Sequence, residues 1–147
     1  MGTRTLRLGK DPHVCKHCFT VSVVEDDEAV RDSLCILLDS HGFTVLAYAS
    51  PRHFLDAADE QKAQCFVFDL HMPEMTGLEL AENMRARAIV TPIIIITGRT
   101  DPVLTQRMQR ANIAAVLPKP VSGDDLLASL EKARGGHIPC CTEASVH

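Results

Sequence analysis

Short apolar runs recur along this chain, and segments with helical periodicity separate them. Successive residues within each run are apolar, so these runs do not show the alternation of apolar and polar residues expected of a strand with one face in solvent. The clearest are Cys-Phe-Val-Phe at 65–68 and Ile-Ile-Ile-Ile-Thr at 93–97. Strands of this kind are buried on both faces, which calls for a parallel sheet with helices on both sides and right-handed crossovers. The pattern therefore predicts an α/β fold.

Five strand and helix pairs can be placed from periodicity and from turn residues. Strands are expected at 19–24, 43–48, 65–69, 93–97 and 113–117, and helices at 27–40, from 50, 76–86, from 101 and 122–133. His41-Gly42 suits a helix end, while Ser50-Pro51 and Asp101-Pro102 suit helix starts. The expected organisation is one domain at 19–134 between tails at 1–18 and 135–147.

Composition narrows the functional classes. A chain of 147 residues with 46% hydrophobic residues suits one globular domain, and a net charge of −4 argues against direct binding of nucleic acid. No apolar run approaches the ~20 residues of a membrane span, and the first residues lack the apolar core of a signal peptide. A cytoplasmic protein without membrane contact is expected.

Six cysteines fall into two groups. Cys35 and Cys65 lie in apolar periodic segments and are expected to be inert core residues. The others form terminal pairs: Cys15 and Cys18, and Cys140 and Cys141. A lone CxxC is a weak metal signal, so a second metal site or a redox pair in the tails competes with incidental thiols in disordered tails.

Polar residues follow the strands at the edge where their carboxyl ends meet. Glu25 and Asp26 follow the first strand, Asp69 ends the third, Thr97 ends the fourth and Lys119 follows the fifth. Open α/β sheets bind ligands at this edge, so the three acids are expected to converge if the first and third strands are neighbours. An all-oxygen cluster of this kind suits Mg²⁺.

Such a site suits phosphoryl transfer, which depends mainly on positioning and on neutralising phosphoryl oxygens. Asp69 is the expected nucleophile and would form an acyl phosphate. Viewed alone, an Asp in this position can also be a helix N-cap, but its acidic and basic companions favour chemistry.

These residues resemble the receiver domain of two-component response regulators, most closely the FixJ-type subgroup, over about residues 19–134. The matching motifs are Val-Val-Glu-Asp-Asp-Glu, Asp-Leu-His-Met-Pro-Glu-Met-Thr-Gly, Ile-Ile-Ile-Thr-Gly and Leu-Pro-Lys-Pro, in the family's order and spacing. The resemblance implies a flavodoxin-like, CheY-like fold: a five-stranded parallel sheet of strand order 2-1-3-4-5 with five helices on both faces.

The resemblance also implies the role of each acid. Asp69 would be the phosphoacceptor and Asp26 a direct ligand of Mg²⁺, for which Mn²⁺ is a possible substitute. Glu25 would hold the ion mainly through water, and the backbone carbonyl of His71 would be another ligand. Asp27 is expected to cap the first helix.

Two further residues complete the family's set. Thr97 would bond a phosphoryl oxygen, and Lys119 would make a charge-assisted bond with the phosphate. The Lys119–Pro120 peptide resembles the family's cis peptide. The plainer alternative is that Lys119 is a surface lysine without a role in the site.

The chain departs from the family three residues before Lys119, where receivers usually carry an aromatic that swings inward on activation and this chain has Val116. Switching would then depend on Thr97, the loop after it and the fourth helix. His71 and Arg99 flank the site and are expected to tune the lifetime of the acyl phosphate, with solvated loop residues as the equal alternative.

The expected partners are a sensor histidine kinase and a downstream protein or second copy, reached through the fourth helix and fifth strand. Exposed Glu28, Arg31 and Asp32 on the first helix are candidates for kinase specificity. About fourteen residues after the last helix are too few for a DNA-binding module. The chain is therefore expected to act through protein contacts or to be a fragment of a DNA-binding transcriptional response regulator.

Two rival functions are weaker. A Mg²⁺-dependent phosphatase with an aspartyl nucleophile usually needs a second acid two residues later, where this chain has His71. A receiver-shaped scaffold that is never phosphorylated, with a metal or redox cysteine tail, would not need the complete set of acids, threonine and lysine. The domain is expected to catalyse only its own phosphorylation and dephosphorylation, not to be an enzyme acting on other substrates.

Overall fold

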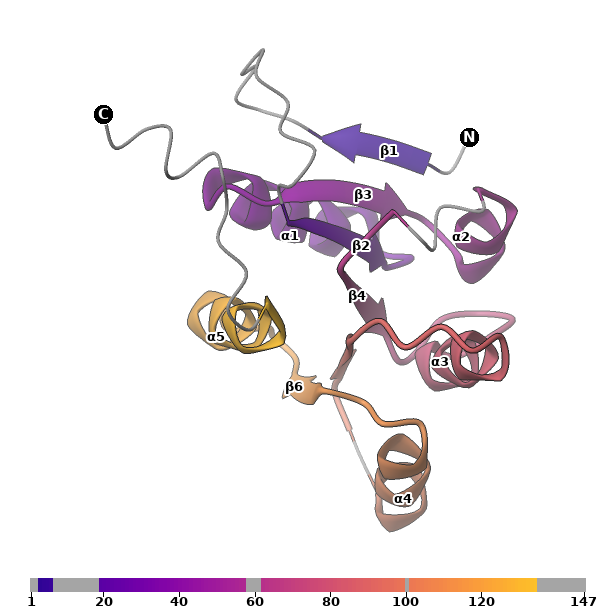
Figure 1. The fold of residues 1–147 in the computed structure, drawn as a ribbon. Coiled ribbons are helices and arrows are strands. Elements are labelled where there is room, and N and C mark those ends of the chain that lie inside the picture. Colours follow the sequence, from indigo (N-terminus) through magenta and orange to yellow (C-terminus); the bar gives the residue numbers. More distant parts are fainter. Residues whose placement is uncertain (1–2, 7–18, 58–61, 100, 135–147) are drawn as a thin grey trace.

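The structure is a computed structural model that describes residues 3–6, 19–57, 62–99 and 101–134 (Figure 1). The strands are β1 (Thr3–Leu6), β2 (Thr20–Val24), β3 (Thr44–Tyr48), β4 (Cys65–Asp69), β5 (Ile93–Thr97) and β6 (Ala115–Pro118). The helices are α1 (Glu28–Ser40), α2 (Pro51–Ala57), α3 (Gly77–Ala86), α4 (Pro102–Arg110) and α5 (Gly123–Arg134). Every predicted strand and helix is present, and the largest boundary shift is in β6, which begins two residues later than predicted.

The sheet has the order β1-β3-β2-β4-β5-β6. Strands β2 to β6 are parallel and follow the predicted order 2-1-3-4-5. Strand β1 was not predicted; it pairs antiparallel with β3, Thr3 facing Tyr48 and Leu6 facing Val45. The segment Thr-Arg-Thr-Leu carries one apolar residue, so its pairing depends on the free edge of β3 and has almost no signal of its own.

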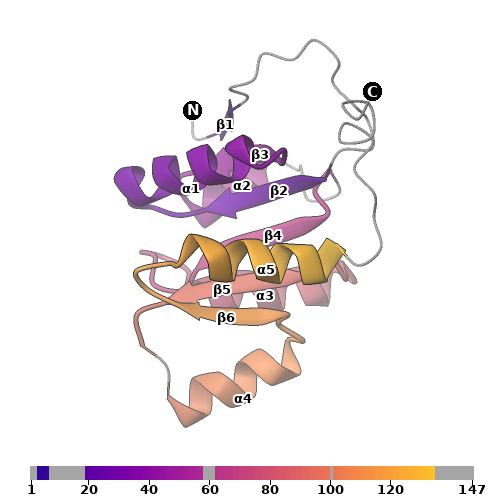
Figure 2. The ribbon, with the colours of Figure 1, turned by 90° about the vertical axis from the view of Figure 1, so that its left-hand side faces the viewer.

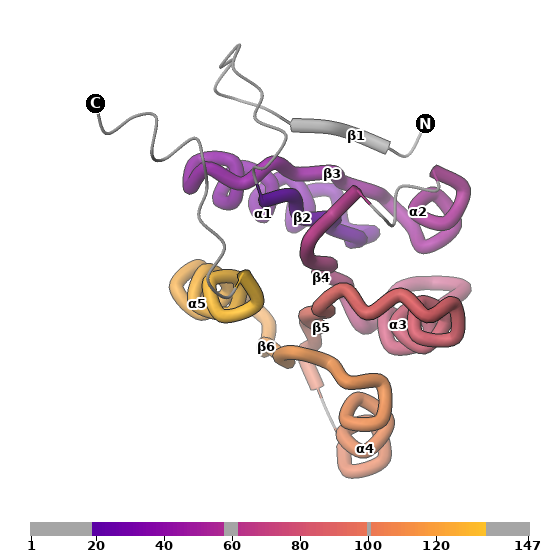
Figure 3. The backbone as a smooth tube through the Cα atoms, in the orientation of Figure 1, coloured from indigo at the N-terminus to yellow at the C-terminus, as the bar shows by residue number. Residues whose placement is uncertain are grey.

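Helices cover both faces of the sheet. Figure 2 shows α1 and α5 in front of the strands, and Figures 1 and 3 show α2, α3 and α4 on the opposite side. Each face has its own core: Val23, Leu38 and Leu126 belong to the α1–α5 side, and Phe54 and Phe68 to the other. The sheet is therefore buried on both faces, as its apolar strands predicted.

Capping side chains start three of the helices where the sequence placed them. Asp27 accepts a hydrogen bond from the backbone of Val30, and Asp101 accepts one from Leu104. Thr76 and Glu79 form a reciprocal capping box at the start of α3. Asp27 and Asp101 stand three and four residues after the strands that precede them, so α1 and α4 begin near the carboxyl edge of the sheet.

The predicted core cysteines are both free and buried. Burial raises the pKa of the Cys65 thiol to about 12, so this thiol is protonated and unreactive at neutral pH. The terminal cysteine pairs, together with any metal or redox role for them, lie outside the described residues. Among the described residues, no helix has the length and apolar character needed to cross a membrane.

Candidate functional site

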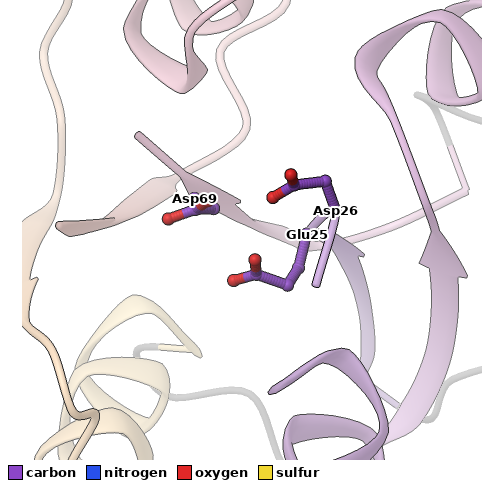
Figure 4. Close-up of side chains that lie close together, drawn as sticks. All are labelled: Glu25, Asp26 and Asp69. Atoms are coloured by element: carbon purple, nitrogen blue, oxygen red, sulfur yellow. The ribbon is translucent and has the colours of Figure 1, made fainter. Parts of the chain in front are cut away.

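Three carboxylates meet beyond the ends of the two central strands. Glu25 and Asp26 directly follow β2, and Asp69 ends β4, which pairs with β2. One carboxylate oxygen from each acid lies within 4.8 Å of the other two, and Figure 4 shows all three side chains directed toward a shared space. Glu25 and Asp69 are each 1% exposed, whereas Asp26 faces solvent. The predicted convergence of the acids is confirmed.

Lys119 follows β6 and places its charge among these acids. Its Nζ lies 2.8 Å from Asp69 Oδ1 and 3.6 Å from Glu25 Oε1. Burial lowers the pKa of Lys119, but hydrogen bonding and attraction to Asp69 and Glu25 outweigh that effect, so its pKa is raised overall. The lysine is therefore charged and tethered to the site, unlike a solvated surface lysine. The Lys119–Pro120 peptide is cis, as the resemblance implied.

The surroundings of the Glu25 carboxyl raise its pKa. Burial is the largest cause that raises its pKa, to about 7, and the charge of Asp69 adds to it. The backbone N–H of Asp27, which donates to Glu25 Oε2 at 3.2 Å, and the charge of Lys119 act in the opposite direction. Near neutral pH the group is thus poised between its neutral and ionised forms.

The donor set fits a small divalent cation. Glu25 Oε1 and Asp69 Oδ1 are buried, and both oxygens share the single positive charge of Lys119. Three hard oxygen donors, one of them open to solvent, suit an ion such as Mg²⁺ that retains several waters. A cation here would also relieve the repulsion that raises the pKa of Glu25.

Thr97 ends β5 beside this cluster, but its hydroxyl is occupied. Oγ1 donates to the carbonyl of Arg99 at 2.6 Å and accepts from the backbone N–H of Arg99 at 3.1 Å. His71 Nε2 lies 3.4 Å from the same oxygen. The two predicted tuning residues are therefore in contact with Thr97. For the hydroxyl to donate to a group on Asp69, it must release the Arg99 carbonyl.

The loop after Asp69 packs against the start of α3 so closely that only glycine fits. A Cβ at Gly77 would lie 2.3 Å from the backbone oxygen of Asp69. The N–H of Gly77 also donates to the Leu70 carbonyl at 3.0 Å. Gly77 stands in the motif that follows Asp69, but its steric role cannot be read from the sequence because the clash involves backbone eight residues away.

The position of Arg31 on α1 differs from the one expected. It was expected to be exposed for kinase recognition, but it is 9% exposed, and its Nη1 donates to the Glu25 carbonyl at 2.8 Å. The signal was present in the sequence, because residues 31, 34, 35 and 38 share one face of a helix and the other three are apolar. Glu28 is exposed and Asp32 half-buried.

Val116, the departure from the family pattern, lies on β6 with 40% of its surface exposed. It lines a cavity of about 600 Å³ between α4 and the ends of β5 and β6, together with Thr97, Arg99 and Met108. The cavity reaches the threonine of the site. Val116 and Thr97 therefore border the same cavity.

Comparison with known proteins places this geometry in a family. Residues 21–131 match the family model of the response regulator receiver domain. The transcriptional regulatory protein FixJ of Bradyrhizobium diazoefficiens is 39% identical over 113 residues, which are 77% of this chain and 55% of that protein. FixJ of Rhizobium meliloti is 34% identical over 115 residues, 78% of this chain and 56% of that protein.

Solved structures give the same result. The FixJ-N crystal structure superposes with a TM-score of 0.71 and 32% identity, covering 82% of this chain and 96% of that one. Chemotaxis protein CheY4 of Vibrio cholerae gives a TM-score of 0.73 and 27% identity, covering 79% and 98%. The chain spans about half the length of the curated relatives it matches. It belongs to the response regulator receiver domains, the family of signalling modules that accept a phosphoryl group in two-component systems.

Proposed function

We propose that Asp69 of this chain accepts the phosphoryl group, from a sensor histidine kinase, in a step that the domain itself catalyses. The observation that carries the proposal is a buried Asp69 carboxylate 2.8 Å from the Lys119 ammonium within a cluster of three acids. One Asp69 oxygen attacks the phosphorus of a phosphohistidine, and the P–N bond breaks as the O–P bond forms. The imidazole nitrogen keeps the bonding pair and takes a proton from solvent.

Glu25, Asp26 and Asp69 would hold the divalent cation, with the backbone carbonyl of His71 as a further ligand. Mg²⁺ is the ion we propose, and Mn²⁺ is a possible substitute with similar oxygen preference. When bound, the cation neutralises negative charge on the phosphoryl oxygens. The buried oxygens of Glu25 and Asp69, two acids that share the single positive charge of Lys119, support this assignment.

Lys119 and Thr97 would complete the phosphoryl site. Lys119 lies beside Asp69, so its charge can stabilise the transferred group without moving far. Thr97 would exchange its bond to the Arg99 carbonyl for one to a phosphoryl oxygen, which would shift the loop between β5 and α4. His71 and Arg99 border this hydroxyl, so we propose that they tune how long the acyl phosphate lasts.

The kinase would dock beside α1. A groove of about 330 Å³ lies between this helix and the loop after β6, and it is lined by Ala29, Val30, Leu37, Val121 and Lys119 among others. Its walls are largely apolar, and Lys119 links it to the phosphoryl site. A helix bearing the phosphohistidine could use this groove, because apolar grooves are common seats for amphipathic helices.

The downstream partner, or a second copy of the chain, would use α4 and β6. Val103 on α4 and Val116 on β6 are exposed apolar residues of this surface. Thr97 and Val116 line the same cavity, so a movement of Thr97 would change the shape of this surface. Phosphorylation would thus change which partner contacts are favourable.

A second candidate function is suggested by the relatives alone. The FixJ proteins are named transcriptional regulatory proteins, and this chain covers about half of each. The chain would then be the receiver part of a DNA-binding transcriptional regulator, in which α4 and β6 govern pairing with an output domain or another copy. Direct binding of nucleic acid by the described domain is not part of this proposal.

The test is intact mass after incubation with Mg²⁺ and acetyl phosphate. A gain of ~80 Da that requires Mg²⁺ and is absent from Asp69→Ala would support the proposal. Asp124→Ala is the matched control, because Asp124 is an exposed acid on α5; it should gain the same mass as the wild type. No gain in the wild type would favour the unphosphorylated scaffold.

A further inference from the structure

Arg31 is the one basic side chain among the described residues that is buried, and its location is unusual. The other buried charged residues there are Glu25 and Asp69, both in the acidic site. Arg31 lies in the second turn of α1, the helix that leaves the acidic loop. No carboxylate of the described residues forms an ion pair with it. The opposite charge that usually compensates a buried cation is therefore missing among these residues.

The guanidinium instead holds a backbone carbonyl. Arg31 Nη1 donates to the oxygen of Glu25 at 2.8 Å, in a buried hydrogen bond. Strand β2 ends at Val24, so this carbonyl lies just beyond the sheet. On its other side, the N–H of Glu25 donates to the Tyr48 carbonyl at 3.1 Å. The peptide units on both sides of Glu25 are therefore fixed, one by β3 and one by α1.

We propose that Arg31 is a positioning residue for the cation site, which keeps the Glu25–Asp26 turn in place while the cation is absent. The carbonyl that it holds belongs to the peptide bond between these two residues, so the bond sets where both carboxylates point. Without it, repulsion among the acids would favour an opened turn. This role rests on the proposed function, because it concerns the same cation.

The effect acts through the backbone rather than through charge. Arg31 bonds the Glu25 carbonyl and forms no ion pair with a carboxylate of the described residues. Lys119 touches the carboxylates themselves, at 2.8 and 3.6 Å. Replacing Arg31 should therefore weaken cation binding by loosening the turn. Groups that orient metal ligands typically contribute about 10- to 100-fold in affinity.

The chain supplies a matched control in Arg85 on α3. Its guanidinium also donates only to backbone carbonyls among the described residues, those of Ala111, Ile89, Thr91 and Asn112, at 2.7 to 3.2 Å. These acceptors precede β5 and β6, at the sheet edge opposite Asp69. Arg85→Gln should cost stability as Arg31→Gln does, but it should leave the cation site unchanged.

The experiment is calorimetric titration of Mg²⁺ into metal-free wild type, Arg31→Gln, Arg31→Lys and Arg85→Gln, with hydrogen exchange measured on the same samples without Mg²⁺. Arg31→Gln should weaken Mg²⁺ binding about tenfold and speed exchange at residues 24–27. Arg31→Lys retains one donor and should fall between. Arg85→Gln should bind Mg²⁺ as the wild type does, with faster exchange confined to its own loops.

Wild-type affinity and wild-type exchange in either Arg31 variant would overturn the inference, as would equal weakening by Arg85→Gln. If Arg31→Gln does not fold, Arg31→Lys carries the comparison with the same criteria. Absence of Mg²⁺ binding to the wild type would instead contradict the proposed function. The exchange pattern of the metal-free proteins would still show whether Arg31 holds the turn.

Discussion

The raised pKa of Glu25 makes the stability of the metal-free protein depend on pH in an unusual direction. The carboxyl titrates near 7 in the folded chain instead of near 4.5, mainly because it is buried and because Asp69 is close. The folded state then binds more protons than the unfolded state between these values. The contribution of Glu25 to stability is therefore full below about pH 4.5 and is lost as the pH rises through 7.

The size of this effect follows from the shift. A tenfold change in a proton-binding constant corresponds to about 1.4 kcal/mol, so the rise from 4.5 to about 7 amounts to about 3 kcal/mol. Glu25→Gln resembles the protonated carboxyl and should lose this dependence. The wild type should thus lose about 3 kcal/mol more than the variant between pH 4.5 and 7.5.

Urea unfolding of both proteins with a chelator present, at half-unit pH steps, measures this difference. The comparison cancels contributions from other titrating groups that the two proteins share. Mg²⁺ at pH 7.5 should restore stability to the wild type, because a ligand that binds only the folded state stabilises it. Parallel stability curves for wild type and Glu25→Gln would refute the reasoning, since the carboxyl would then titrate normally in the folded chain.

Three stability predictions concern single residues, all measurable by urea unfolding. Gly77→Ala should lower the free energy of unfolding by about 2–3 kcal/mol, because the new Cβ would meet the Asp69 backbone. A loss below about 0.5 kcal/mol would contradict the close approach. Ser22→Ala should stabilise by about 1 kcal/mol, since the buried Ser22 hydroxyl has no partner among the described residues. A loss would mean that the hydroxyl is satisfied. Glu82→Gln should cost under about 1 kcal/mol, because the Glu82–Arg107 pair of α3 and α4 is partly solvated; a larger loss would show a greater role.

Much of the fold follows from local chemistry. Wholly apolar strands such as Ile93–Thr97 cannot face water, so they require helices on both sides of a parallel sheet. Side chains of Asp27 and Asp101 cap helices within three residues, so helix starts are readable without tertiary information. Strand β1 was not foreseen because its pairing depends on the exposed edge of β3, far along the sequence.

The sequence by itself determined which chemical groups stand at the carboxyl edge: Glu25 and Asp26, Asp69, Thr97 and Lys119 each end or follow a strand. Strand ends are local features, and parallel strands bring them to one edge. Only the tertiary structure decided how these groups are held, with Lys119 between two acids and His71 beside the Thr97 hydroxyl. It also decided that Gly77 packs directly against the Asp69 backbone and that the Arg31 guanidinium bonds the Glu25 carbonyl, because such contacts depend on packing distances that a sequence does not contain.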